Sequence, residues 1–156
     1  MFETQVIKPL GAVVVLRRIC TPLLAVYLVI GMIAAYRAWY QVRSLNLSTS
    51  NLILRAGTNI ESDVVSYART PVDVRIELIQ GTHIETISFQ HVTDNEWAFF
   101  DPRNQRASQT TILSADLLAR FAPGQAQLRA TAIGRPQWMR LPPPVVRELT
   151  VEIPRN

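Results

Sequence analysis

The sequence predicts an all-β domain, a sandwich of about seven strands, preceded by one N-terminal transmembrane α-helix. Three observations lead to this fold class. Residues 19–36 form an uncharged apolar run. From Ser44 onward apolar and polar residues alternate, which is the periodicity of half-buried strands. Turn-forming residues separate the alternating segments at short intervals, as is typical of a β-sandwich.

The apolar run at 19–36 matches a membrane span. At 1.5 Å per residue it extends roughly 27 Å, close to the hydrocarbon thickness of a bilayer. Pro22 is expected in the first turn of this span, where its missing N–H costs little. Basic side chains can snorkel at a membrane boundary, and aromatic rings prefer the headgroup level. We therefore predict these interface anchors: Arg17, Arg18, Tyr36, Arg37, Trp39 and Tyr40.

The span is interpreted as a retained signal anchor rather than a cleaved signal peptide. The region before it is long, and no A-x-A pair marks a cleavage site after it. Arg17 and Arg18 adjoin its start, which favours a cytoplasmic N-terminus and a periplasmic C-terminal domain. The predicted organisation in the inner membrane is a leader over 1–18, an anchor helix over 19–40 and an extracytoplasmic domain over 41–156.

Two features near and within the span bear on helix packing. Residues 10–16 (LGAVVVL) are apolar but too few to cross a bilayer, so they either extend the helix in the interface or pack on a neighbouring membrane protein. Within the span, small residues spaced i, i+4 allow helices to approach closely. They are Gly31 with Ala35 and Ala34 with Ala38. The span contains no histidine to ligate haem or chlorophyll, so we predict no cofactor, with contacts to lipid or pigment left open.

A hairpin is the clearest β element. Residues 72–79 (VDVRIELI) alternate strictly, residues 80–83 form a turn, and residues 84–92 form the partner strand. On that partner strand Ile87 and Phe89 are predicted to face inward. Further strands are predicted at 45–54, 59–67, 96–100, 110–113, 125–133 and 145–153, with a short helix at 114–120 capped by Ser114. Alternate residues of the strand at 125–133 are predicted to face inward: Ala126, Leu128, Ala130 and Ala132.

The end of the chain resembles a known fold family. The run APGQAQLRATA at 122–132 follows a short helical turn and precedes a final VVRELTVEI strand. This arrangement resembles the E–F–G end of immunoglobulin-like and fibronectin-III-like domains. The resemblance covers residues 44–156 and implies an Ig-like sandwich of two sheets. It implies no activity, because a fold of this kind serves many functions.

The distribution of charge argues against a nucleic-acid partner. The first 43 residues contain five basic residues and one acidic residue, while the remainder contains eleven of each. The net charge of +4 therefore belongs to the anchor region. In the domain, acids and arginines are interleaved, as in Asp73, Arg75 and Glu77, which we interpret as an ordinary solvated surface. Nucleic-acid binding would need clustered basic residues on one face.

No catalytic or metal site is predicted. The chain has no G-x-S-x-G motif, and its single cysteine, Cys20, lies in the span. His83 and His91 lie on one strand about 27 Å apart, too far to share a metal. The protein is therefore predicted not to be an enzyme.

A tryptophan in a loop-like segment is the best candidate for partner docking. Trp138 is flanked by Arg135 and Arg140, and an aromatic ring between arginines is typical of an interface anchor. The alternative is that the ring tucks under its own loop.

Two functions fit these observations. The first is a non-catalytic accessory subunit of a larger membrane complex, for example a bioenergetic one such as a photosynthetic reaction centre or respiratory complex. Its partners would be bilayer lipid and other integral membrane proteins. The alternative is a membrane-tethered extracytoplasmic binding module for a glycan, a peptide or a cell-wall polymer.

Overall fold

The computed structural model describes most of the chain. The described residues are 10–66, 71–92, 105–135 and 140–155, and for residues 10–19 only the helical backbone is described. The chain divides into two compact units, residues 1–35 and residues 36–156.

The long helix α1 runs from Leu10 to Trp39 without a break. It is longer than the predicted span because the apolar residues 10–16 are also helical, which both interpretations of this segment allow. Pro22 therefore lies in the helix interior and not in its first turn, which corrects the prediction. The segment Cys20–Trp39 is long and apolar enough to cross a membrane, and its most apolar window is not buried in the described structure.

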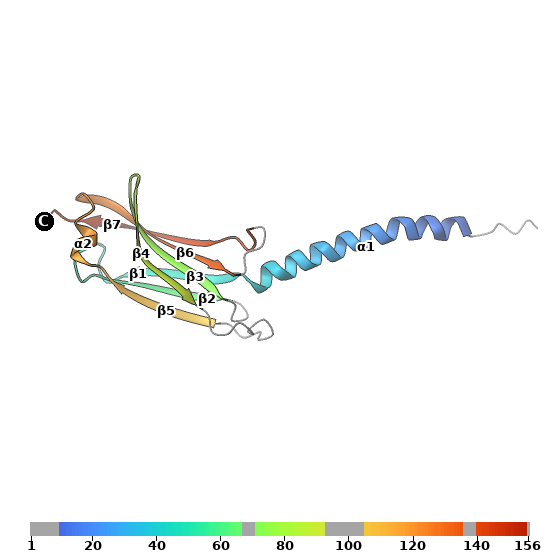
Figure 1. The fold of residues 1–156 in the computed structure, drawn as a ribbon, viewed down its shortest axis with the longest axis horizontal. Coiled ribbons are helices and arrows are strands. Elements are labelled where there is room, and N and C mark those ends of the chain that lie inside the picture. The colour runs from blue at the N-terminus through green and yellow to red at the C-terminus, as the bar shows by residue number, and fades with distance from the viewer. Residues whose placement is uncertain (1–9, 67–70, 93–104, 136–139, 156) are drawn as a thin grey trace, which may run out of the picture. The chain divides into compact units, whose positions relative to one another are not determined.

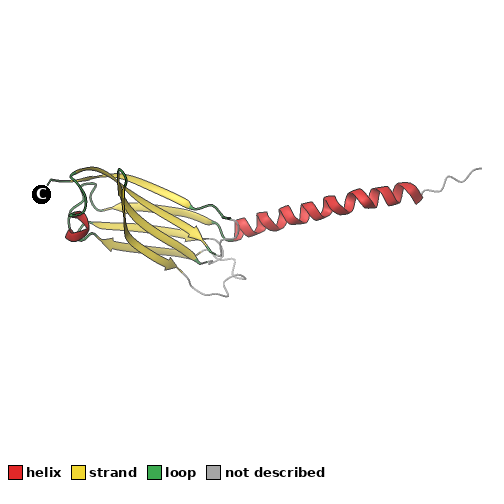
Figure 2. Ribbon diagram, turned by 45° about the horizontal axis from the view of Figure 1, so that its top comes forward, coloured by secondary structure: helices red, strands yellow, loops and turns green. Residues whose placement is uncertain are grey.

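Within the described residues, seven strands form two antiparallel sheets, which confirms a mostly β, two-sheet domain (Figures 1 and 2). In chain order they are β1 (Val42–Thr49), β2 (Asn59–Ser66), β3 (Val72–Gln80), β4 (His83–Val92), β5 (Gln105–Ile112), β6 (Gly124–Gly134) and β7 (Val145–Ile153). One sheet has the order β1-β2-β5, and the other has the order β4-β3-β6-β7. A single helical turn, α2 (Ala115–Leu118), connects β5 to β6.

The core lies between the two sheets, where the alternating apolar residues meet. On β3 the buried residues include Val74, Ile76 and Leu78, and Leu78 pairs with the equally buried Leu128 of β6. The inward set predicted for the 125–133 strand is confirmed, since all four residues are buried. The other sheet supplies Leu45 and other apolar side chains from β1 and β2 to the same cluster. Period-two alternation thus gives each sheet one core face and one outer face.

Some predicted boundaries shift for local reasons. The strand predicted at 45–54 ends at Thr49, because the side chain of Asn51 accepts a hydrogen bond from the Ile53 N–H at 2.9 Å and turns the chain. Leu54 then donates to the Glu152 carbonyl at 2.8 Å, so this segment joins the edge of β7. The predicted cap is confirmed, as the Ser114 hydroxyl accepts from the Leu117 N–H at 3.2 Å. The strand predicted at 96–100 lies outside the described residues.

The predicted hairpin is confirmed, but its register is not uniform. Gly81, with φ of 59°, occupies the two-residue turn between β3 and β4. Glu77 pairs with Thr86 and Ile76 pairs with Ser88, so Ile87 is an extra residue, a β-bulge. Beyond the bulge the faces of β4 exchange. Phe89 is exposed on the outer face, and its predicted inward position is therefore wrong.

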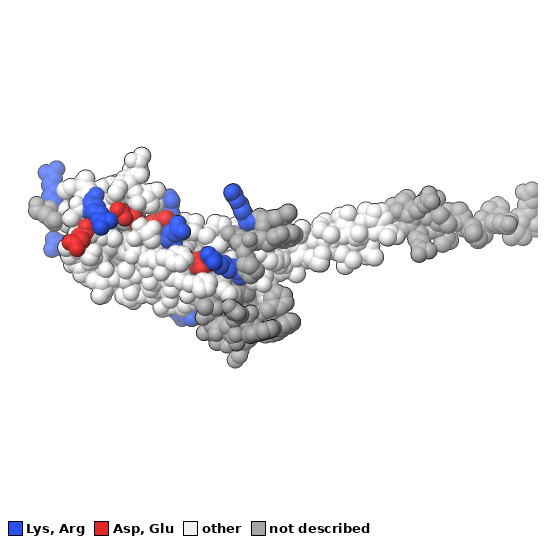
Figure 3. Space-filling model, in the orientation of Figure 1, with Lys and Arg blue, Asp and Glu red and all other residues white. Residues whose placement is uncertain are grey.

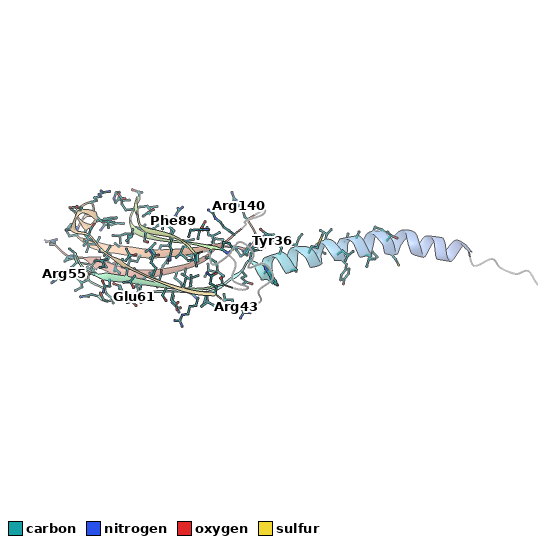
Figure 4. All side chains as sticks on the ribbon, turned by 60° about the horizontal axis from the view of Figure 1, so that its bottom comes forward. Tyr36, Arg43, Arg55, Glu61, Phe89 and Arg140 are labelled. Carbon is teal, nitrogen blue, oxygen red and sulfur yellow. The ribbon has the colours of Figure 1, made fainter. Side chains whose placement is uncertain are left out.

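At the end of the sandwich where the chain enters β1, Gly134 of β6 lies directly against the backbone of Tyr40. A Cβ at Gly134 would overlap the carbonyl oxygen of Tyr40, so only glycine allows this close approach. Figure 4 shows Arg43 and Arg140 near this end of the domain and Arg55 near the other. The ends of β3, β4 and β6 that carry Val72, Val92 and Gly134 are therefore at the chain-entry end.

Candidate functional site

A groove of about 590 Å³ lies on the outer face of the four-stranded sheet. Strands β3, β4 and β6 and the residue that follows β6 supply its lining, which includes Asp73, Arg75, Glu77, Phe89, Thr131 and Arg135. Figure 3 shows acidic and basic side chains interleaved on the face turned toward the viewer. In Figure 4 the labelled Phe89 lies on the opposite side of the sandwich from Glu61, which belongs to the other sheet.

The bulge at Ile87 determines which residues of β4 reach this groove. Because Gln80 pairs with His83, an uninterrupted hairpin would place Ser88 opposite Arg75. The extra residue instead places Phe89 opposite Arg75. The Arg75 guanidinium carbon lies 6.0 Å from the centroid of the Phe89 ring, at the outer limit of a cation–π contact.

The same shift places His91 opposite Asp73, where three side chains meet. The Nδ1 of His91 lies 2.6 Å from Oδ1 of Asp73, and since a carboxylate only accepts, Nδ1 carries the proton and donates it. Arg135 reaches the second oxygen of Asp73 through its Nε. The backbone N–H of Arg135 donates to the Pro71 carbonyl at 2.8 Å, which fixes the residue beside the start of β3. Asp73 is thus paired on both oxygens and nearly buried.

The groove presents its two signs of charge unequally. The side chains of Arg75 and Arg135 are 54% and 57% exposed. By contrast, those of Asp73 and Glu77 are only 11% and 16% exposed. Although the formal charges of these four residues balance, solvent meets mainly guanidinium groups. The interpretation of residues 73–77 as an ordinary solvated surface is corrected accordingly, because Asp73 is covered by its two partners.

The outer face of the three-stranded sheet also carries an ion pair. Arg106 donates to both oxygens of Asp63, from Nε at 2.9 and 3.1 Å and from Nη2 at 2.7 Å. Ser108 adds a hydroxyl at 3.1 Å. These hydrogen bonds from Arg106 hold the pKa of Asp63 below its usual value, against a weaker opposing effect of desolvation. The shallow groove here, about 470 Å³, is lined by polar side chains and no aromatic ring among the described residues.

The predicted docking residues are only partly described by the structure. Arg135 lines the groove, whereas Arg140, with φ of 58°, is not among the described lining residues. Trp138 lies outside the described residues. The contribution of this trio to docking stays a prediction.

The predicted membrane residues all fall on α1 or directly after it. The small residues Gly31, Ala34, Ala35 and Ala38 are exposed on the helix. Arg17 and Arg18 are helical, but their side chains lie outside the description. Of the anchors beyond them (Tyr36, Arg37, Trp39 and Tyr40), Tyr36 and Tyr40 have ring centroids 4.8 Å apart. Their roles at a membrane stay predictions.

Sequence reasoning missed Asp73, His91 and Phe89 as one cluster. The outward position of Asp73 is readable from the alternation, but its partner across the strands depends on the bulge. Among the described residues, no group of three or more His, Cys, Asp or Glu side chains is placed to hold a metal ion.

Comparison with known proteins gives no identity. No family model matches the sequence, and no curated protein matches it. One solved structure, "Crystal structure of protein from Archaeoglobus fulgidus", is 12% identical, with a TM-score of 0.36. The match covers 74% of this chain and 100% of that one. A likeness at this level carries no information about function.

Proposed function

We propose that the protein is a single-pass inner-membrane protein with a cytoplasmic N-terminus and a periplasmic sandwich domain. It serves as a non-catalytic accessory subunit of a larger membrane complex, with a bioenergetic complex as one candidate host. The apolar helix α1 is the anchor, and the outer face of the four-stranded sheet docks a partner protein.

The strand order supports an immunoglobulin-like assignment of the sandwich. When the strands are lettered A, B, C, C′, E, F and G in chain order, the sheets become A-B-E and C′-C-F-G. This is the arrangement of fibronectin-III-like domains, a variant of the immunoglobulin sandwich. Domains of this architecture often act by presenting a sheet face or loops to a partner, and the fold alone carries no activity.

The observation that carries the docking proposal is the exposed ring of Phe89 beside Arg75. An exposed aromatic ring next to arginine is typical of the centre of a protein interface. The bulge that turns this ring outward interrupts an otherwise regular strand pair, and such bulges often re-aim a side chain at a functional site.

Purification from native membranes in mild detergent tests the proposal. We expect the full chain to migrate with a stoichiometric membrane complex, and Phe89→Ala to release it from that complex. Thr110→Ala, on the other sheet, is the matched control and should leave the complex intact. A chain that migrates as a monomer under these conditions contradicts the accessory role.

The proposed orientation is tested separately. Thr82 is exposed in the hairpin turn, so Thr82→Cys in a Cys20→Ser background offers a single accessible thiol. A membrane-impermeant maleimide should label this thiol in cells whose inner membrane is intact. Labelling only after that membrane is disrupted would place the domain in the cytoplasm.

A binding module for a glycan, a peptide or a cell-wall polymer is the second candidate. It is favoured by the same groove, since sugar rings stack on aromatic side chains while charged groups bind their hydroxyls. A monomeric chain that sediments with purified peptidoglycan, and loses this property in Phe89→Ala, would favour it over the accessory role.

A further inference from the structure

We propose that the groove on the four-stranded sheet binds an extended acidic segment of the partner protein. The segment carries two carboxylates two residues apart, and its third residue on the same face is not acidic. This inference rests on the proposed docking function and specifies the chemistry of the partner.

The spacing follows from the geometry of β3. Its outward residues Asp73, Arg75 and Glu77 succeed one another every two residues, which is about 6.6 Å along a strand. Arg75 stands at the middle position, and the guanidinium of Arg135 joins the position of Asp73. An extended peptide repeats its side chains on one face at the same interval. Carboxylates at i and i+2 therefore match these two cationic positions.

The sign of charge follows from what the groove exposes. Arg135 contacts Asp73 through Nε, and its side chain is 57% exposed, so within the described structure its terminal amino groups are open to an incoming acceptor. Arg75 contacts Glu77 by a single nitrogen at 3.5 Å, a long and partly exposed pair. Both guanidiniums can thus form paired hydrogen bonds with an incoming carboxylate, the arrangement that arginine favours. An incoming ammonium group would instead meet these cations first.

Apolar side chains flank the two cationic positions. Phe89 lies across from Arg75 on β4, and Ile133 lies across from Asp73 on β6. Both line the groove. They offer contacts for the aliphatic parts of a bound segment and exclude water from its ion pairs, which strengthens those pairs.

Glu77 gives the groove a direction. Its carboxylate occupies the third outward position of β3, two residues beyond Arg75. A third acidic residue of the ligand would meet this like charge, whereas a lysine would be attracted to it. The expected pattern is acid, spacer, acid, spacer, base.

Labelled peptides and the full chain in mild detergent test this pattern by fluorescence anisotropy at low salt. The probe TEVEVKT has carboxylates at i and i+2, TQVQVKT replaces them with amides, and TEEVVKT has the same composition with carboxylates on opposite faces. We expect TQVQVKT to bind at least about tenfold more weakly and TEEVVKT at least about fivefold more weakly, since each loses charge-assisted contacts. Equal binding of the three peptides would overturn the proposal.

Variants assign the binding to this groove. Arg75→Gln and Arg135→Gln should each weaken TEVEVKT binding about fivefold or more, and Arg75→Lys should restore part of the loss. Arg106→Gln, on the opposite sheet, should bind like the unmodified chain. Thermal melts verify that each variant is folded. If Arg106→Gln weakens binding as much as Arg75→Gln, the site is not this groove. Tighter binding of alginate, an anionic polysaccharide, than of TEVEVKT would overturn the assignment to a peptide.

The outcomes separate this inference from the docking function. A complex that Phe89→Ala releases, together with peptides that do not differ, would overturn the acidic-segment assignment and leave the docking role standing. Peptides that differ as expected, together with a chain that migrates alone from native membranes, would support the acidic-segment specificity and contradict the accessory role.

Discussion

The two outer faces of the sandwich carry the same kind of ion pair in different states. On the three-stranded sheet, Arg106 binds both oxygens of Asp63 and Ser108 adds a third group. On the four-stranded sheet, Asp73 is shared between His91 and Arg135. The first pair is closed, because Arg106 binds Asp63 from two nitrogens, and the second is open, because within the described structure Arg135 contacts Asp73 from Nε alone. A closed pair contributes to the surface of a domain, and an open pair can also receive a ligand.

Strand register accounts for much of the difference. The β2–β5 pair runs without interruption, so Asp63 faces Ser108 and small polar residues continue along the edge strand. The β3–β4 pair contains the extra residue Ile87, which brings an aromatic ring and an imidazole to the outer face. One inserted residue thus places an aromatic ring and an imidazole, instead of small polar side chains, on the outer face of a strand pair.

A substitution in the core that the two sheets share should destabilise both outer faces together and have the largest effect. Leu128 is fully buried between the sheets, so Leu128→Ala should lower the free energy of unfolding by about 2–5 kcal/mol through lost burial and a cavity. Denaturant unfolding of the full chain in detergent measures the change. A loss below about 0.5 kcal/mol would show that the two sheets are not packed through this residue.

Deleting Ile87 should remove the bulge without exchanging the faces of β4. The deletion joins Thr86 to Ser88, so the strand becomes regular, while Phe89 still pairs with Arg75 and His91 with Asp73. Because the lost side chain packs against the core, unfolding experiments should show a decrease in stability of about 1–2 kcal/mol. The NMR resonances of His91 should keep the signature of its contact with Asp73. Loss of that contact would show that the local bend of the bulge, and not the register alone, places His91 beside Asp73.

The two-sheet fold can be predicted from the sequence, but the groove can be predicted only in part. Alternation around Ile76 and Leu128 is strict, and a core that must bury these residues leaves one face for each strand. The bulge has no such signature. Both Ile87 and Phe89 are apolar, so an inward position for both is the natural inference, and only the packing of the whole hairpin decides between them. The Asp73–Arg135 pair joins residues far apart in the chain, and alternation within one strand does not predict which residues of another strand lie beside it.

Asp73, the aspartate of the open pair, should contribute more to stability than Asp63, the aspartate of the closed pair. Asp73 is nearly buried, so Asp73→Asn weakens two charge-assisted contacts and should cost about 1 kcal/mol. Asp63→Asn is the matched change on the other sheet, where the pair is more exposed and solvent compensates for more of the loss. Thermal melts of both variants should show the larger decrease for Asp73→Asn. The reverse order would contradict the distinction drawn between the two faces.

The smallest expected effect is on stability at acidic pH, and it comes from the closed pair of Asp63 and Arg106. Hydrogen bonds from Arg106 lower the pKa of Asp63 below its ordinary value of 3.8, so the folded chain releases this proton more readily than the unfolded chain. The resulting stabilisation is fully present above pH 3.8 and is lost as the pH falls through the lowered native value. Arg106→Gln should therefore flatten the acid side of the stability profile, as measured by melting temperatures between pH 7 and pH 2. An acid profile that is as steep in Arg106→Gln as in the unmodified chain would show that Asp63 does not depend on this arginine. Because the pair is exposed, added salt should reduce the difference between the two profiles.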